Sequence, residues 1–455
     1  MQRFELNLEK GAHIHFIGIG GISMSGLAML MIDRGYTVTG SDRGESHIIK
    51  HLQKKGAKVF IGHDGANVDG AELVVHTAAV HDDNPEMIRA RELGICVIDR
   101  AEFLGAVMKQ YKNAVGVSGT HGKTTTTGML TYALLENDTD PTVSIGGELD
   151  VIDGNFRIGA SDYFLTEACE YTNSFLKFYP RVVLITNIEE DHLDFFSGIE
   201  EIRESFRNFA CLAKDGFVIA NGEDENVRIA LDSIENKLTY GLNPGNDFYA
   251  GSIKYENGYP VFDVLYKDEP VCSIALNVPG EHNILNALAT VAVCVVMGLD
   301  PKKAALGIGK FCGTKRRFEK KGMCKEAVVI DDYAHHPTEI KATIKAASAV
   351  SHNRICCIFQ PHTYTRTKTL WNDFVNSFYG VDKLILTDIY AARELPDGET
   401  TSEKLAEAIK ETGMDVVYIE KFEDIAEYVK SYAEKGDIIF TMGAGTVTDI
   451  SKYLI

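Results

Sequence analysis

The stretch AVGVSGTHGKTTTTGML, residues 114–130, decides the fold of the middle of the chain. An apolar strand runs into glycines, a lysine and threonines, and a helical segment follows. Gly119 and Gly122 let the backbone turn so that N–H groups point at phosphate oxygens, and the positive end of the following helix attracts the same anion. Val117 stands where the strict G-x-x-x-x-G-K-[ST] motif has its first glycine. A glycine turn with an exposed lysine is the alternative, but the order of strand, loop and helix favours an ATP or GTP site.

The side chains of this loop suit a nucleotide bound together with magnesium. Lys123 would reach the β- and γ-phosphates, and the hydroxyl of Thr124 would bind Mg²⁺. We therefore predict a cofactor site in one continuous segment: Gly119, Thr120, His121, Gly122, Lys123, Thr124 and Thr125.

Carboxylates follow two further strands of the same region. The strand SDYFLTEA, residues 161–168, leads to Glu167 and Glu170, and the strand RVVLITNI, residues 181–188, leads to a second set. This second set is Glu189, Glu190, Asp191 and His192. Because ligands gather at the carboxyl ends of strands in open α/β sheets, we expect both sets beside the phosphate loop, where Mg²⁺ needs oxygen ligands. A solvated loop is the alternative for either set taken alone.

A second glycine loop lies near the start of the chain, in HIHFIGIGGISMSGLA. Its glycines are Gly18, Gly20 and Gly21. Ser23 replaces the third glycine of the dinucleotide fingerprint, and the next strand ends on Asp42, at roughly the ~20-residue offset of a ribose-binding acid in a dehydrogenase. Glycine loops at a helix N-terminus bind any pyrophosphate, however, so a uridine nucleotide fits as well. Asp42 is then either a contact on the uridine side or a turn residue.

The organisation of the chain predicts three α/β domains. At 455 residues the chain exceeds one compact core, and ~150 residues per domain is the usual size. Short β-branched strands alternate with helical segments in the first quarter, around the phosphate loop and again after residue 326, which predicts mainly parallel sheets. We place the boundaries at residues 1–110, 111–315 and 316–455.

Charge and composition exclude several classes of protein. A net charge of −19 disfavours binding to nucleic acid or to anionic membranes. The nine cysteines contain no C-x-x-C pair, so neither a disulfide framework nor a zinc site is indicated, and we expect most of them to be buried. The longest apolar run falls short of the ~18 residues that span a bilayer, and the first ten residues do not form a leader, so we expect a cytoplasmic protein.

Several motifs of the chain resemble those of a known family. GTHGKTTTT, EACEYTNSF and NIEEDHLD are similar to the ATP-binding centre of the Mur ligases, which make the amide bonds of peptidoglycan precursors. GIGGISMSG, FCGTKRRFE, DDYAHHPTEI and QPHTYTRT extend the resemblance over nearly the whole chain. The resemblance implies an N-terminal Rossmann-like domain that binds UDP, a central P-loop ATPase-like domain, and a C-terminal Rossmann-like domain that binds an amino acid.

The resemblance also implies roles in ATP binding. Lys123 and Thr124 would hold the phosphates and a first Mg²⁺, Glu170 would bridge metals, and His192 would bind a second Mg²⁺. Four residues elsewhere would contact ATP: Asn283 and Asn286 of GEHNILNALA the adenine, Arg317 the phosphates and Asp332 the ribose. Helix capping and packing is the alternative for the asparagines, and a solvated patch is the alternative for the Arg316–Arg317 pair.

The other substrates are assigned in the same way. The resemblance implies a uridine nucleotide sugar on Gly18, Gly20, Gly21, Ile22, Ser23 and Asp42. The amino acid would lie between His335 and Arg366, with Arg366 on its carboxylate and His335 orienting or deprotonating its amine. Thr363 stands where some relatives carry another arginine, so Thr363 or Tyr364 would add only a hydroxyl. The alternative is that His335 and His336 cap the following helix.

The implied reaction is an ATP-dependent ligation. ATP would convert the lactyl carboxylate of UDP-N-acetylmuramate to an acyl phosphate, which the amine of L-alanine would attack, releasing phosphate. The catalytic residues would be Lys123, Glu170, His192, Arg317 and His335. Three alternatives stay open: a related ligase that adds a tripeptide to the same sugar nucleotide, an NAD-dependent dehydrogenase, and a regulatory NTPase.

Overall fold

The computed structural model describes residues 4–193, 195–392 and 394–455. The chain forms two compact units. The first contains the residues up to Thr239 together with Ala292–Leu299, and the second contains Tyr240–Val291 and Asp300–Ile455. The division falls inside strand β12 (Lys237–Gly241) and inside helix α8 (Glu281–Val296).

The first unit is built from strands and helices in regular alternation, with three short 3₁₀ helices written η. They are β1 (His13–Ile17), α1 (Ile22–Asp33), β2 (Thr37–Asp42), α2 (His47–Lys54), β3 (Lys58–Ile61), η1 (Gly65–Val68), β4 (Leu73–His76), α3 (Pro85–Glu92), β5 (Cys96–Asp99), α4 (Arg100–Met108), β6 (Asn113–Ser118), α5 (Lys123–Glu136), β7 (Thr142–Leu149), η2 (Asp150–Ile152), β8 (Gly154–Arg157), β9 (Tyr163–Glu167), η3 (Tyr171–Lys177), β10 (Val182–Ile185), α6 (Ile199–Ala210), β11 (Phe217–Asn221) and α7 (Glu225–Ala230).

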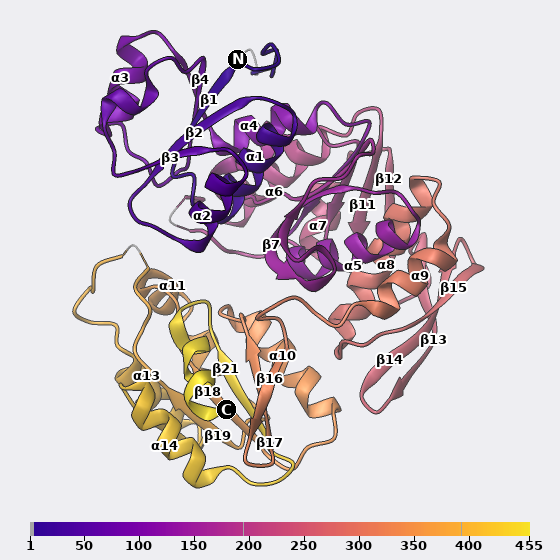
Figure 1. The fold of residues 1–455 in the computed structure, drawn as a ribbon. Coiled ribbons are helices and arrows are strands. Elements are labelled where there is room, and N and C mark those ends of the chain that lie inside the picture. The colour runs from indigo at the N-terminus through magenta and orange to yellow at the C-terminus, as the bar shows by residue number, and fades with distance from the viewer. Residues whose placement is uncertain (1–3, 194, 393) are drawn as a thin grey trace. The chain divides into compact units, whose positions relative to one another are not determined.

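The first sheet of this unit is parallel throughout, in the order β3-β2-β1-β4-β5 (Figure 1). Side chains of β1 alternate between its faces. Ile14 and Phe16 join a large apolar core that α1 and α4 cover, whereas Ile17 packs on the smaller cluster below α3. The chain leaves β1 through α1 on one face of the sheet and leaves β4 through α3 on the other. In sheets of this class, ligands bind at the carboxyl ends of two such strands.

The second sheet of the unit carries the phosphate loop at its centre. The strands that belong to the first unit follow the order β11-β10-β6-β9-β7-β8, and only β7 and β8 pair antiparallel. β6 lies between β9 and β10, and the three strands are buried on both faces. The loops that follow these three strands therefore share one edge of the sheet.

The second unit begins with an antiparallel β-meander and ends with a third sheet. Its elements are β13 (Phe248–Glu256), β14 (Tyr259–Tyr266), β15 (Glu269–Ala275), α9 (Pro301–Lys310), β16 (Glu319–Cys324), β17 (Ala327–Asp332), α10 (Pro337–Ala349), β18 (Ile355–Phe359), α11 (Tyr364–Thr369), α12 (Trp371–Val375), β19 (Lys383–Leu386), α13 (Ser402–Glu411), β20 (Val416–Tyr418), α14 (Phe422–Tyr432), β21 (Ile438–Met442), η4 (Thr446–Ile450) and α15 (Ser451–Leu454).

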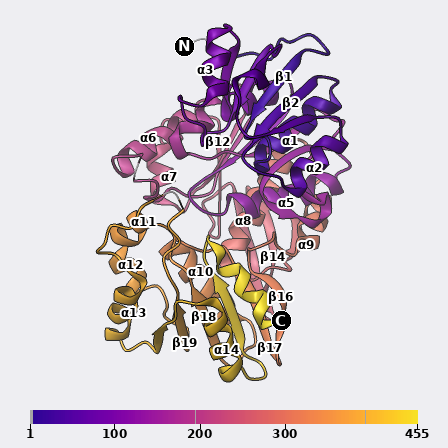
Figure 2. The ribbon, with the colours of Figure 1, turned by 60° about the vertical axis from the view of Figure 1, so that its left-hand side comes forward.

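Helices cover both faces of the third sheet (Figure 2). Its order is β16-β17-β21-β18-β19-β20, parallel except for β16. In β18, Cys357 and Phe359 pack with α10 and α13, while Cys356 and Ile358 pack with α14. This explains why the strand ICCIF is apolar at every position.

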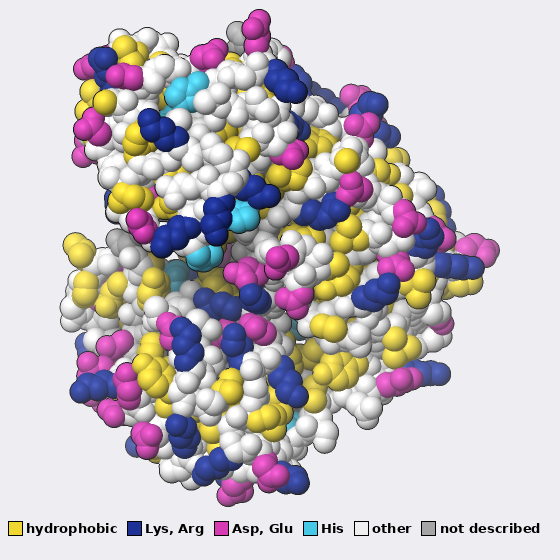
Figure 3. Space-filling view, viewed as in Figure 1, with side chains coloured by type: hydrophobic (Ala, Val, Ile, Leu, Met, Phe, Trp, Pro, Cys, Tyr) yellow, Lys and Arg dark blue, Asp and Glu magenta, His cyan; other side chains and the backbone are white. Residues whose placement is uncertain are grey.

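These observations confirm the predicted α/β class, with one correction. We expect most cysteines to be buried, but of the nine only Cys294, Cys324, Cys356 and Cys357 are, so this prediction is wrong. The other five lie on loops, strand edges and helix ends, where a cysteine needs no apolar surroundings. Within the described residues every cysteine is free. In the same residues no helix is both long and apolar enough to cross a bilayer. Figure 3 shows acidic and basic side chains intermixed on one face of the molecule.

Candidate active site

The loop between β6 and α5 has the shape that the sequence predicts. Gly119 and Gly122 both have positive φ, 136° and 84°, and Gly122 is the N-cap residue of α5. A Cβ on Gly119 would lie 1.9 Å from Oγ1 of Thr186, so no other residue fits there. Helix α5 begins at Lys123, directly after this loop. The backbone N–H groups of its first turn have no hydrogen-bond partner within the helix and can bind an anion at the end of β6.

Lys123 forms an ion pair with Glu170. Its Nζ lies 3.0 Å from Oε2 and 3.2 Å from Oε1 of Glu170, and it also donates to the carbonyl oxygens of Gly119 and Thr120. Glu170 is buried, with 3 % of its surface exposed. Burial opposes the charge on Lys123, but the neighbouring carboxylate of Glu170 raises the pKa of this lysine above its usual value. The ammonium group is therefore charged at neutral pH and held at the mouth of the loop.

Glu167, at the end of β9, reaches the same loop. Its Oε2 accepts a hydrogen bond from Oγ1 of Thr124 at 3.2 Å, and its Oε1 accepts one from the backbone N–H of Gly146 at 2.6 Å. Thr124 thus lies beside one predicted carboxylate while its neighbour Lys123 binds the other. The structure brings together the predicted lysine, threonine and both glutamates of the motif.

His192 completes this cluster. Its Nε2 lies 3.9 Å from Oε1 of Glu170 and 3.8 Å from Oδ2 of Asp191, and its ring contacts that of Tyr171, with 4.6 Å between the ring centroids and a tilt of 34°. The backbone of His192 has a φ of 54°, a conformation that costs energy for a residue with a side chain. Glu190, from the same acidic run, is exposed.

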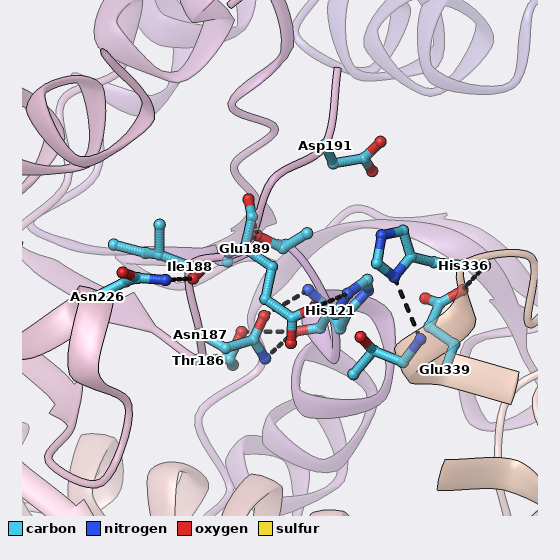
Figure 4. Close-up of polar contacts among 12 residues, drawn as sticks. His121, Thr186, Asn187, Ile188, Glu189, Asp191, Asn226, His336 and Glu339 are labelled. Atoms are coloured by element: carbon cyan, nitrogen blue, oxygen red, sulfur yellow. Dashed lines mark hydrogen bonds and ion pairs between the residues drawn. The ribbon is translucent and has the colours of Figure 1, made fainter. Parts of the chain in front are cut away.

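The loop after β10 is hydrogen-bonded to the phosphate loop (Figure 4). The backbone N–H of His121 donates to Oδ1 of Asn187 at 2.8 Å, and Nδ2 of Asn187 donates back to the carbonyl of His121 at 3.0 Å. The hydroxyl of Thr186 donates to the same carbonyl at 2.6 Å, and the side chain of Glu189 lies 3.4 Å from Nε2 of His121. His121 therefore contributes to the shape of the loop through its backbone.

The glycine loop after β1 is bonded within the protein. The N–H groups of Gly18 and Ile19 donate to the carbonyl of Ser41, and that of Gly21 donates to Gly18. The N–H of Gly20 donates to Oδ2 of Asp42 at 2.9 Å. Asp42 therefore holds the loop, as expected for a turn residue. The backbone donors that remain for a ligand are those of Ile22, Ser23 and Met24 in the first turn of α1, which lacks a side-chain cap.

A cation that the sequence analysis missed lies beside this loop. Nη1 of Arg100, the first residue of α4, donates to Oγ of Ser23 at 3.2 Å. Burial lowers the pKa of Arg100, yet within the described chain no carboxylate lies at ion-pair distance, because its neighbour Asp99 pairs with Lys177 instead. Arginine stays charged in proteins. Its position directly after a parallel strand, CVID, is the signal that marks it as a site residue.

In the second unit, the segment that carries Arg317 is hydrogen-bonded to the end of β17, where Asp332 lies. Arg317 is 3.5 Å from Glu339 and stacks over Tyr333, with 5.2 Å to the ring centroid. Asp332 accepts hydrogen bonds from the backbone N–H groups of Phe318 at 2.7 Å and Ala334 at 2.8 Å. Burial raises the pKa of Asp332 to about 6, against the opposite effect of Arg317. Asp332 therefore fixes the backbone on which Arg317 is carried.

His335 lies close to His362 and Arg366. Nδ1 of His335 is 2.9 Å from the carbonyl of Tyr333, which assigns the proton to Nδ1, and its ring is 5.6 Å from that of His362. Nη1 of Arg366 is 3.1 Å from Nδ1 of His362. Burial lowers the pKa of His335 to about 4. His335 is thus a neutral ring at pH 7.

The neighbours of these residues have structural contacts. His336 is the N-cap of α10 and forms a capping box with Glu339, so the capping alternative holds for His336. Thr363 has a φ of 67° and caps α11 through its hydroxyl, which accepts from the N–H of Arg366 at 3.4 Å. A β-branched residue rarely adopts this φ.

Asn283 and Asn286 are buried on one face of α8. Nδ2 of Asn286 donates to Oδ1 of Asn283 at 3.1 Å, and Nδ2 of Asn283 donates to the carbonyl of Pro279 at 2.7 Å. These contacts tie the start of the helix to the segment before it, as the packing alternative requires.

Comparison with known proteins now identifies the family. Three family models match in succession: the Mur ligase family, catalytic domain, at residues 13–112; the Mur ligase middle domain at residues 117–294; and the Mur ligase, glutamate ligase domain at residues 316–445. The chain belongs to the Mur ligase family. The resemblance and the predicted three-part architecture are thereby confirmed.

Individual Mur ligases match along their full length. The UDP-N-acetylmuramate–L-alanine ligases of Caldanaerobacter subterraneus and Acetivibrio thermocellus are 51% and 50% identical, over 98% and 99% of this chain and 98% and 97% of theirs. The crystal structure of the UDP-N-acetylmuramate-alanine ligase of Thermotoga maritima is 29% identical, with a TM-score of 0.80 over 97% of this chain and 98% of that one. A murein peptide ligase from Psychrobacter arcticus is 25% identical, with a TM-score of 0.69 over 98% of both chains.

Proposed function

We propose that this protein is an ATP-dependent ligase that joins L-alanine to the lactyl carboxylate of UDP-N-acetylmuramate. The observation that carries the proposal is the full-length similarity, at 50–51% sequence identity, to ligases named for this pair of substrates. The cluster around Lys123 supports it, since a loop lysine paired with a buried carboxylate suits phosphoryl transfer to a carboxylate.

The residues beside the loop fit a magnesium ion. The hydroxyl of Thr124 and the carboxylates of Glu167 and Glu170 are the hard oxygen ligands that Mg²⁺ prefers, and buried Glu170 already pairs with the cation of Lys123. His192 would be a weaker, nitrogen ligand. A bound Mg²⁺ would supply positive charge to the phosphate oxygens during transfer.

The chain's own residues would act on the nucleotides as follows. Lys123 neutralises charge that spreads over the transferred phosphoryl group. Arg100, together with the N–H groups of Ile22 and Ser23, holds the pyrophosphate of the sugar nucleotide. Arg317 and Asp332 keep the roles at ATP that the resemblance implies, with Asp332 also fixing the turn that carries Arg317.

The amino acid would be oriented by His335 and Arg366. With its proton on Nδ1, His335 offers Nε2 as a hydrogen-bond acceptor to the amine of alanine. A pKa of about 4 makes this ring a weak base at pH 7, so orientation of the amine is the better supported of its two predicted roles. Arg366 would bind the carboxylate of alanine.

A phosphate-release assay tests the proposal. The protein is incubated with ATP, Mg²⁺, UDP-N-acetylmuramate and each amino acid in turn, and with a tripeptide in a parallel series. Release that requires both the sugar nucleotide and L-alanine is expected. Release with the tripeptide instead would assign the related peptide ligase activity, and release without any acceptor would indicate a regulatory NTPase.

A further inference from the structure

Glu339 contacts both a residue assigned to ATP and a residue assigned to the amino acid. It is the third residue of α10, and its side chain is only 11% exposed. Its Oε1 lies 3.5 Å from Nη1 of Arg317, and its Oε2 lies 3.2 Å from Nδ1 of His335. The same Oε2 accepts a hydrogen bond from the backbone N–H of His335 at 3.1 Å. Within the second unit, one carboxylate therefore joins the nucleotide side of the site to the amino-acid side.

Part of this arrangement is an ordinary helix cap. Glu339 and the N-cap residue His336 form a capping box, in which the carboxylate accepts from the backbone N–H of His336 at 3.4 Å. A capping box takes either glutamate or glutamine at this position, so it needs a side-chain oxygen and no negative charge. The cap therefore explains the backbone contact, but it does not explain why the carboxylate also approaches Arg317 and the ring of His335.

The charge of Glu339 acts on the ring of His335. The proton on Nδ1 of this ring faces the carbonyl of Tyr333 and Oε2 of Glu339, which leaves Nε2 as the acceptor. Burial, together with the nearby Arg366 and His362, lowers the pKa of the ring. The carboxylate of Glu339 raises that pKa, because a negative charge favours the protonated imidazole. The base strength of His335 thus depends on how fully the charge of Glu339 is available to it.

Arg317 competes with His335 for this charge. A carboxylate that is shared with a guanidinium stabilises a second cation less, because the positive charge cancels part of its field. The side chain of Arg317 is 27% exposed and is therefore accessible to an anionic ligand. When Arg317 binds phosphate oxygens instead, more of the negative charge of Glu339 acts on His335.

We propose that Glu339 is a positioning residue that couples nucleotide binding, through Arg317, to proton transfer at His335. The inference rests on the proposed function, which places Arg317 at the phosphates of ATP and His335 at the amine of L-alanine. With ATP bound, the ammonium group of alanine gives one proton to Nε2 of His335, and the imidazolium that forms keeps its Nδ1 proton beside Glu339. The neutral amine then carries the lone pair that attacks the acyl phosphate. Without the nucleotide, His335 is a weak base and the amine stays protonated.

A titration of His335 tests the coupling. NMR spectra of the full chain with isotope-labelled histidine are recorded over pH, with and without the non-hydrolysable analogue AMP-PNP and Mg²⁺, and His335→Gln identifies the resonance. In the parent protein the pKa of His335, about 4 without a nucleotide, is expected to rise by about one pH unit at saturating analogue. Glu339→Gln should abolish the rise. Glu403→Gln, which changes an exposed glutamate in the first turn of α13, is the matched control and should behave like the parent.

Kinetics provide a second readout that a helix cap would not change. Glu339→Gln should lower kcat/KM for L-alanine about tenfold at pH 7, and it should not raise the KM for ATP. The loss should shrink as the pH is raised to about 9, because more of the amine is then neutral without a base. The melting temperature should stay close to that of the parent, since glutamine keeps the capping hydrogen bonds.

Three results would contradict these expectations in different ways. If saturating analogue left the titration of His335 in the parent unchanged, the coupling would be overturned, and this measurement needs no variant that has to fold. A rise that persists in Glu339→Gln would overturn the role of Glu339. A parent protein that shows the rise but releases no phosphate with UDP-N-acetylmuramate and L-alanine would overturn the proposed function, whereas the coupling between the nucleotide and His335 would stand.

Discussion

In the loop after β1, the backbone N–H groups of the three glycines bond to the protein itself, and Arg100, from another strand end, contacts Ser23 in the following helix. In the loop after β6, the cation is Lys123, part of the loop's own sequence, and Glu170 balances its charge. Both loops join a strand to a helix, so both aim a helix N-terminus at the sheet edge. The difference shows that one backbone shape can obtain its positive charge locally or from a distant segment.

The largest effect is expected from the local cation. Lys123→Ala should lower the turnover rate at least roughly a hundredfold, since one preorganised charge is worth ~3 kcal/mol in a transition state. The protein should stay folded, but its melting temperature should fall, because the buried carboxylate of Glu170 loses its cation. Phosphate release and circular dichroism check both parts, with the exposed Lys112→Ala as control. A near-normal rate would contradict the assignment of the phosphate loop.

The partner of that lysine gives the next effect. Glu170→Gln should raise the Mg²⁺ concentration needed for half-maximal activity by roughly tenfold or more, because an amide oxygen is a poorer ligand for a hard dication. The measurement is a Mg²⁺ titration of activity, with exposed Glu190→Gln as the matched control. An unchanged curve would move the metal site to Glu167.

The distant cation of the first loop is tested by Arg100→Gln. The KM for UDP-N-acetylmuramate should rise about tenfold, as loss of a charge-assisted hydrogen bond predicts, and the KM for ATP should stay the same. Steady-state kinetics with each substrate varied in turn provides the comparison. If both KM values rose together, the two loops would not be independent anion sites.

A substitution outside both loops tests the site proposed for the amino acid. Arg366→Ala should raise the KM for L-alanine about tenfold, by the ~1.4 kcal/mol of a charge-assisted hydrogen bond, and leave both nucleotide KM values unchanged. Lys368→Ala, an exposed cation on the same helix, is the control. A rise in the KM for ATP instead would place Arg366 at the phosphate site.

The smallest effect separates a uridine site from a dinucleotide site. UDP at ~5 times its Kd should stabilise the protein by ~1 kcal/mol, seen as a slightly higher melting temperature, whereas NADH at the same concentration should leave it unchanged. Melting curves followed by fluorescence give the answer directly. Equal stabilisation by NADH would support the dehydrogenase alternative for the first loop.

The sequence predicted the contacts of the second loop because its functional residues are adjacent in the chain. The strand, glycines and Lys123 of the second loop are adjacent in the chain, and the carboxyl ends of parallel strands predict that Glu167 and Glu170 meet them. Arg100 was missed because it stands in no glycine motif, and its role depends on the fold bringing it to Ser23, 77 positions away. The proposed domain boundaries and the individual site roles stay predictions.

Contacts that depend on a third element were also beyond the sequence. The acidic residue at the end of β2 fits a nucleotide contact or a turn, and the sequence does not show that Asp42 accepts a hydrogen bond from Gly20. The hydroxyl of Thr363 is taken up by the cap of α11, which a comparison of residue types cannot show. In each case a short polar side chain had several partners within reach, and the tertiary fold chose among them.

The ion pair between Lys123 and Glu170 has a consequence for which anions the protein binds. A bare phosphate or sulfate must displace a buried carboxylate from the lysine and leave that carboxylate without a cation, which is unfavourable in a poorly solvated site. A nucleotide that arrives with its own divalent cation replaces both members of the pair at once. The ion pair would therefore weaken the binding of free phosphate and sulfate to the loop and favour the metal-bound nucleotide.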